Sequence, residues 1–314
     1  MYFKLSYITR DFFFVENTEI KTSDPNRGVN VVLKQRPNIG TSSPPFEVND
    51  GLIVATCERD LTQRLMSETI DSGVLSFKKQ AVSQIFHDMY DCAIRTLRLV
   101  RWRINARGGP NPMRALPPNH FEWSLNGSDW KPIADTMSLK IGFVRVSPIW
   151  TKEYADFVQT GLVQGINEPL AHELLREAGI NRQNRRSSLV LAVAAAEVGF
   201  KQFASRSLPD AEWLLELPSP PLTEMLQKFP WEKLKPRING KAPFVPEPIL
   251  KELKKAVVLR NKIVHSGTAN LDDDTLDSIL ETVSDFLYLL DMLTGSGQVW
   301  ASENLRPETL ISLK

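Results

Sequence analysis

The spacing of apolar residues differs between the two halves of the chain. In the first half, short apolar segments alternate with segments rich in proline, serine and asparagine, which is typical of strands joined by turns. Asn126-Gly127 predicts a β-hairpin over residues 121–133, because both residues tolerate a positive φ between positions suited to strands. Further strands are predicted over residues 1–8, 28–33, 52–57 and 139–146, and one long helix over 78–104, where Val82, Ile85, Met89 and Ala93 share a side.

From about residue 154 the apolar residues recur with a helical period. The last predicted helix begins after Asp272, which supplies a cap at the end where the helix dipole is positive. We therefore predict an α+β protein with a mixed α/β domain, rich in short antiparallel strands, over residues 1–155 and an all-α helical bundle over 156–314. The predicted helices cover residues 171–178, 187–205, 210–217, 222–229, 248–265 and 274–293. The apolar stripe of the last helix consists of Leu276, Ile279, Val283, Phe286, Leu287 and Leu290.

Polar residues interrupt the apolar stripes of two of these helices. On a helical wheel, Arg260 and Asn261 fall inside the stripe of helix 248–265, and His265 falls at its edge. Glu197 interrupts the stripe of helix 187–205 in the same way. A core-facing charge is costly unless it is paired, so Glu197 and Arg260 are candidates to meet across the bundle. The stripe of helix 248–265 is formed by Leu250, Leu253, Val257 and Val264, and the stripe of helix 187–205 by Val190, Val193, Phe200 and Ala204.

Two interpretations of these polar residues stay open at this point. In the first, Glu197 and Arg260 form an ion pair that only neutralises two charges, and His265 only precedes a helix end at Gly267, which suits a left-handed cap. In the second, the same residues form a catalytic site. The ion pair alone gives no reason for a histidine at position 265.

The charge balance limits the kind of partner. The chain has 38 lysines and arginines against 37 aspartates and glutamates, so it is not a strongly cationic nucleic-acid-binding protein and any RNA contact must come from a local cluster. Either of two arginine clusters could bind RNA. For the first cluster, a solvated face or a salt-bridge surface between domains would use the same residues. The second cluster lies at a helix N-terminus, where it opposes the helix dipole, so either a phosphate or an acidic neighbour would relieve it. The first cluster is Arg95, Arg98 and Arg101, spaced on one helix face beside Trp102, and the second is Arg182, Arg185 and Arg186, close to the helix that carries Glu197.

Several function classes find no support in the sequence. The four histidines and two cysteines show no metal-ligand spacing, so neither a metal nor another cofactor is expected. No phosphate-binding loop and no dinucleotide-binding glycine motif is present. The N-terminal segment lacks the features of a signal peptide and no apolar run reaches the length of a membrane span, so we expect a cytoplasmic, soluble protein without membrane partners.

The motif R-N-K-I-V-H at residues 260–265 resembles the R-x(4–6)-H signature of the HEPN superfamily, in which many members also have an asparagine directly after the arginine. The helix around V-A-A-A-E-V-G-F resembles the first core helix of bacterial HEPN domains, in which a glutamate faces the motif. This resemblance covers roughly residues 165–295. It implies a HEPN-like helical bundle that forms a homodimer and brings two motifs into one cleft.

The resemblance also implies an activity, since many HEPN domains are metal-independent endoribonucleases of toxin, CRISPR-associated and anti-phage defence systems. His265 would act as general acid or base, Arg260 would bind phosphate oxygens, and Asn261 would orient either the histidine or the phosphate. Glu197 would hold Arg260. RNA would supply its own nucleophile, the 2′-OH, and the product would carry a 2′,3′-cyclic phosphate.

The resemblance leaves the regulation and two other functions open. In HEPN toxins with a nucleotidyltransferase antitoxin, the tyrosine that receives the modification lies two residues after the histidine, where this chain has Gly267. An antitoxin or a defence-system protein remains an expected partner, but that mode of regulation is doubtful here. Other HEPN proteins have lost activity and serve as dimerisation, RNA-binding or sensor modules. A general RNA-binding protein that uses the helix with Arg95 is a third interpretation.

Overall fold

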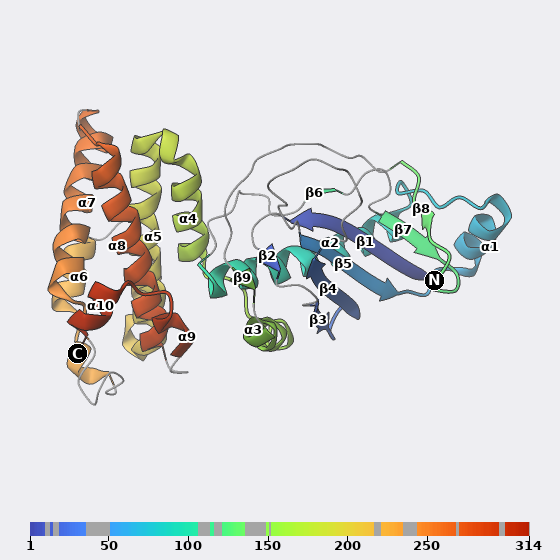
Figure 1. Ribbon diagram of the computed structural model, residues 1–314, viewed down its shortest axis with the longest axis horizontal. Coiled ribbons are helices and arrows are strands. Elements are labelled where there is room, and N and C mark those ends of the chain that lie inside the picture. Colours follow the sequence, from blue (N-terminus) through green and yellow to red (C-terminus); the bar gives the residue numbers. More distant parts are fainter. Residues whose placement is uncertain are drawn as a thin grey trace. The chain divides into compact units, whose positions relative to one another are not determined.

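The computed structural model consists of two compact units, residues 1–167 and 168–314, each of which is described by itself (Figure 1). The structure describes residues 1–9, 13–14, 19–35, 51–105, 114–115, 121–135, 149–150, 152–216, 221–234, 244–267, 270–294 and 299–313. The N-terminal unit contains a β-sheet with helices, and the C-terminal unit contains helices in its described part. The protein therefore belongs to the α+β class, as predicted.

An antiparallel sheet forms the centre of the N-terminal unit, in the order β3-β4-β5-β1-β7-β8 with β6 also paired to β1. Strand β5 shows why this sequence forms a sheet with one covered face: Ile53, Ala55 and Cys57 are buried and the residues between them are half-buried. A separate parallel pair joins β2 and β9. The strands are β1 (Tyr2–Thr9), β2 (Phe13–Phe14), β3 (Glu19–Asp24), β4 (Val29–Gln35), β5 (Gly51–Glu58), β6 (Arg114–Ala115), β7 (Phe121–Ser124), β8 (Lys131–Pro132) and β9 (Ile149–Trp150).

Helices α1 (Gln63–Ser72), α2 (Gln80–Arg103) and α3 (Lys152–Val163) complete the N-terminal unit. The predicted long helix is confirmed as α2, which packs on β5 and β4 through the predicted side. Helix α3 packs on β3 and α2, so it belongs to this unit and the boundary lies at residue 167, later than the predicted residue 155. The four residues that were predicted to share one side of α2, namely Val82, Ile85, Met89 and Ala93, are all buried.

The predicted hairpin is confirmed between β7 and β8, but its connection is longer than a two-residue turn. Asn126 organises this loop, because its side-chain oxygen accepts hydrogen bonds at 2.9 Å from the backbone N–H groups of Ser128 and Asp129. Gly127 has the predicted positive φ, +75°. The strand predicted over residues 139–146 lies outside the described residues. Strands β2, β3, β6 and β9 and helices α1 and α3 were not predicted.

The C-terminal unit is a helical bundle in which α5 contacts α4, α7 and α8. Each predicted helix is present within a few residues of its expected limits, although the one predicted over 210–217 is a 3₁₀ helix. Short helices α9 and α10 were not predicted. The helices are α4 (Leu170–Ile180), η1 (Asn181–Gln183), α5 (Arg185–Ser207), η2 (Pro209–Glu216), α6 (Leu222–Lys228), η3 (Trp231–Lys233), α7 (Glu247–Ser266), α8 (Asp273–Leu293), α9 (Val299–Ser302) and α10 (Pro307–Ser312).

Helix α8 forms as the sequence predicts. The Asp272 carboxylate accepts a hydrogen bond at 2.7 Å from the backbone N–H of Thr275 and so caps the helix. All six residues of the predicted stripe are buried. On another side of α8, the buried carboxylate of Asp285 accepts hydrogen bonds from the backbone N–H of Arg306 at 3.1 Å and from its guanidinium at 2.7 Å, which attaches the segment before α10.

Helix α5 has the length and apolar composition that a membrane span also has. However, 56% of its most apolar window is buried inside the protein, which is typical of a core helix in a soluble protein. Small residues let neighbouring helices approach α5. Gly199 is an example, since a Cβ at this position would collide with Leu287 of α8 and would lie 3.2 Å from the Cβ of Ala171 in α4.

We expect Gly199→Ala to lower the free energy of unfolding by about 1–3 kcal/mol, because the buried Leu287 side chain, or α4 and α8 themselves, must shift to admit the methyl group. Gly179→Ala is the matched control, since a Cβ at this position of α4 has no neighbour within 4 Å. The control should instead gain up to about 1 kcal/mol from helix propensity. Urea denaturation measures both changes, and an equal gain in the two variants would contradict the close packing at Gly199.

Candidate functional site

An ion pair between Glu197 of α5 and Arg260 of α7 lies at the centre of the candidate site. The guanidinium Nη2 donates a hydrogen bond to the Glu197 carboxylate. The side chains are mostly buried, with 11% of Glu197 and 20% of Arg260 exposed. The prediction that these two residues meet across the bundle is therefore confirmed, although they are 63 positions apart in the sequence.

The buried side of α7 differs from the predicted stripe. Ile249, Leu253 and Ala256 are buried, and Arg260 continues this row one turn later, where Glu197 meets it. Asn261 lies about 100° further round the helix and is exposed, so the expectation that it points into the core is wrong. Val264 is also exposed, to 56%. The broad apolar arc of α7 allowed two choices of inner face, and the contacts with α5 and α8 decide between them.

His265 lies in the last turn of α7 and is exposed. The helix ends as predicted at Gly267, which adopts the left-handed conformation with φ +66° and donates its backbone N–H to the Ile263 carbonyl at 3.1 Å. His265 follows Arg260 by five residues, which places the two side chains about 140° apart around the helix. Within the described residues, Arg260 thus faces α5 while His265 faces solvent.

Burial and the neighbouring cations act in opposite directions on the pKa of the Glu197 carboxyl. Burial raises the pKa of the Glu197 carboxyl, although Arg260 and Lys201 oppose this shift. The Nε of Arg260 is buried and has no hydrogen-bond partner among the described residues. Arg260 is therefore held by Glu197 through one guanidinium nitrogen, and its buried Nε is closed to a phosphate oxygen, so a phosphate would have to be bound by the remaining guanidinium N–H groups.

The predicted RNA-binding face of α2 is not formed. Arg101 is only 2% exposed, whereas Arg98 is exposed. The Arg95 guanidinium donates to the backbone carbonyls of Gly161, Leu162 and Ile166 at the end of α3, at 3.1–3.4 Å. Each step of three residues turns the helix by about 60°, so the three arginines diverge over a third of its circumference instead of sharing one exposed face.

The second predicted cluster, at the beginning of α5, lies against acidic residues of α8. Arg182 forms an ion pair with Asp277, and Arg185 binds Asp273 with two hydrogen bonds of 2.6 and 2.9 Å. Arg186 is exposed. Arginines at a helix N-terminus oppose the helix dipole, and the carboxylates of α8 relieve this repulsion in place of a phosphate.

A further polar pair, which was not predicted, connects α4 with α8. The Nε2 of His172 lies 2.9 Å from the Asp291 carboxylate, and its ring packs against Tyr288 with a centroid distance of 4.8 Å. The two residues line a small hollow together with Gln202 and Arg206. They are 119 positions apart and belong to no motif, so the sequence carried no signal for the pair.

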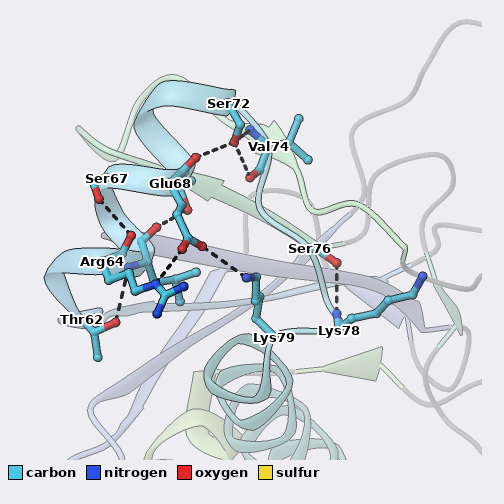
Figure 2. Close-up of polar contacts among 11 residues, drawn as sticks. Thr62, Arg64, Ser67, Glu68, Ser72, Val74, Ser76, Lys78 and Lys79 are labelled. Atoms are coloured by element: carbon cyan, nitrogen blue, oxygen red, sulfur yellow. Dashed lines mark hydrogen bonds and ion pairs between the residues drawn. The ribbon is translucent and has the colours of Figure 1, made fainter.

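Polar contacts also gather around α1 in the N-terminal unit, as Figure 2 shows. The Glu68 carboxylate binds Arg64 at 3.0 Å and Lys79 at 3.3 Å, and these two cations keep its pKa below the usual range. The contacts connect α1 with the start of α2. They are exposed and satisfied by one another, so we assign them a structural role.

Neither a metal cluster nor a known relative identifies the site. Within the part of the chain that the structure describes, no three His, Cys, Asp or Glu residues are grouped so that they could hold a metal ion. Comparison with protein-family models, with curated proteins and with solved structures finds no match. The functional argument therefore depends on the residues around the Glu197–Arg260 pair.

The Glu197–Arg260 pair should stabilise the bundle measurably. We expect Glu197→Ala and Arg260→Ala each to lower the free energy of unfolding by about 2–3 kcal/mol, below the value for a fully buried pair because both side chains are partly exposed. In a double-mutant cycle followed by urea denaturation, the coupling energy should be about 1–2 kcal/mol.

The exposed pair between Lys228 and Glu224, 3.7 Å apart on α6, is the control for this cycle. It should show a much smaller coupling, because solvent screens it. Additive effects of Glu197→Ala and Arg260→Ala would contradict the ion pair.

Proposed function

We propose that the C-terminal unit is a HEPN-type endoribonuclease that cleaves RNA without a metal ion. The observation that supports this most is the pairing of Glu197 with Arg260 on the helix that carries His265. An ion pair that served only the fold would not need an exposed histidine five residues later on the same helix. The same arrangement matches what the resemblance of R-N-K-I-V-H implies.

The proposed cleavage uses three side chains of α7 and the 2′-OH that the RNA itself supplies. The ribose 2′-oxygen attacks the adjacent phosphorus, the bond from phosphorus to the 5′-oxygen breaks, and the products are a 2′,3′-cyclic phosphate and a 5′-hydroxyl. His265 removes the 2′-OH proton or supplies one to the leaving oxygen, since imidazole exchanges protons near neutral pH. Arg260 stabilises the charge on the phosphate oxygens, and the exposed amide of Asn261 orients the phosphate.

A second copy of the chain would complete the site. Arg260 and His265 leave α7 on different sides, so one chain does not direct both at the same phosphate. The flank of α7 between these sides carries Leu250 and Val257, both half-buried, and the exposed Val264. We propose that this flank pairs with its counterpart in a homodimer, where a two-fold axis would bring two motifs together.

The cellular role is also a proposal. A cytoplasmic toxin or anti-phage defence enzyme fits the proposed reaction, with an antitoxin or a defence protein as partner and the N-terminal unit as a recognition or regulatory element. An inactive HEPN-type dimer that binds RNA or senses a signal is the second candidate function. The divergence of Arg260 and His265 within one chain favours it, because a binding module does not need them to converge.

Cleavage of generic single-stranded RNA in EDTA tests the proposed activity. We expect fragments with 2′,3′-cyclic phosphate ends, and a loss of about 10²–10⁴-fold in rate for His265→Ala and for Arg260→Ala, because one removes proton transfer and the other charge stabilisation. His87→Ala, at an exposed position of α2, is the matched control and should cleave as the wild type does. Equal rates in all variants, or no cleavage by the wild type, would reject the enzyme.

Sedimentation tests the proposed dimer. We expect Val264→Glu to shift the protein towards the monomer and to reduce cleavage, because it places two carboxylates at a self-paired apolar contact. Ile311→Glu is the matched control, since Ile311 of α10 is 68% exposed and lies outside the proposed contact. A monomeric wild type, or the same mass for all three proteins, would show that α7 does not mediate a dimer.

A further inference from the structure

The solvent-facing side of α7 is basic. Lys251, Lys254 and Lys262 are exposed and lie at helical spacing on the side that also presents Asn261 and His265. Lys251 and Lys262 are eleven positions apart, so the lysines extend about 16.5 Å along the helix axis. We call Lys251, Lys254, Lys262 and Asn261 the α7 lysine face.

The lysines of the α7 lysine face form no ion pair within the described residues. Helix α7 contains two acidic residues, Glu247 and Glu252. Glu252 binds Lys255 at 3.1 Å and Ser278 at 3.3 Å, whereas Glu247 lies at the N-terminal end of the same side as the lysines. No described carboxylate forms an ion pair with any of the three lysines, in contrast to Arg182 and Arg185, which both bind acids of α8.

We propose that the α7 lysine face binds the phosphates of a single RNA strand and leads the strand to His265. This inference rests on the proposed function for its choice of RNA as the polyanion. Lysine binds phosphate as a point charge and reads no base, so the contact should be independent of sequence. The proposed surface differs from both arginine clusters that the sequence suggested.

The composition of the face argues against two other occupants. If two copies paired through it, lysines would lie opposite lysines, and such a contact is repulsive. The dimer flank with Val257 and Val264 adjoins the α7 lysine face at Lys254 and Asn261. Lys251 and Lys262 lie about 120–160° from the flank around the helix, so the proposed dimer leaves these two lysines accessible. A membrane-binding helix needs a broad apolar side, whereas Val258 is the apolar residue on this one.

The test measures binding of a single-stranded 2′-O-methyl oligonucleotide, which keeps the phosphates but lacks the nucleophile for cleavage. We expect Lys254→Gln/Lys262→Gln to weaken binding on the order of tenfold at moderate salt and to reduce the salt-dependence slope by about 1.4, which is two phosphate contacts on a single strand. The matched control, Lys228→Gln/Lys233→Gln, removes two exposed lysines from the same unit and should retain both values.

The binding and cleavage measurements test the lysine face and the proposed nuclease separately. The inference fails if the wild type does not bind the oligonucleotide, if both double variants lose affinity equally, or if the α7 variant loses binding to anionic vesicles and not to the oligonucleotide. If the α7 variant alone loses affinity while the wild type cleaves no RNA, the lysine face stands and the proposed nuclease fails. If the wild type cleaves RNA and the α7 variant binds and cleaves equally well, the nuclease stands and the lysine face fails.

Discussion

The need to pair the Glu197 carboxylate with Arg260 constrains how α7 lies in the C-terminal bundle. Helix α5 contacts α4, α8 and α7, so a carboxylate on its buried side would be costly without a cation opposite. Arg260 satisfies this requirement only when α7 is turned so that Ile249, Leu253 and Ala256 also face inward. This rotation in turn directs Asn261 and His265 towards solvent.

The division of α7 into an inner and an outer side links the fold to the proposed chemistry. Arg260 is held in a partly dry position, where its interaction with an anion would be stronger than in water. His265 is accessible to a substrate and to solvent protons. Within one chain, Arg260 and His265 lie on different sides of α7. The proposed reaction therefore also depends on groups from outside the chain, namely the RNA and a second copy of the protein.

The contacts of the cationic residues show why a cluster of charges in the sequence is a weak guide to a binding surface. Arg95 binds backbone carbonyls at the end of α3, Arg101 is buried, and Arg182 and Arg185 are neutralised by α8. These arginines are clustered in the sequence but serve the fold. Lys251, Lys254 and Lys262 of α7 are less conspicuous in the sequence, yet none of them forms an ion pair with a described acidic residue.

The sequence by itself determined the local elements and much of the bundle. The limits of α2, α5, α7 and α8, the Asp272 cap and the Gly267 helix end follow from periodicity and capping, which depend on residues close in the chain. The wheel positions also suggested that Glu197 and Arg260 would meet. For the hairpin, the sequence predicted the position but not the loop length.

Only the tertiary structure decided which side of each element is buried and which residues become partners. It turned Asn261 outward, joined His172 to Asp291 and placed α3 with the N-terminal sheet. None of this is encoded locally, because the inner face of a helix with a broad apolar arc depends on the shapes of the helices packed against it. A charge likewise remains free or becomes paired according to residues that are distant in sequence and adjacent only after folding.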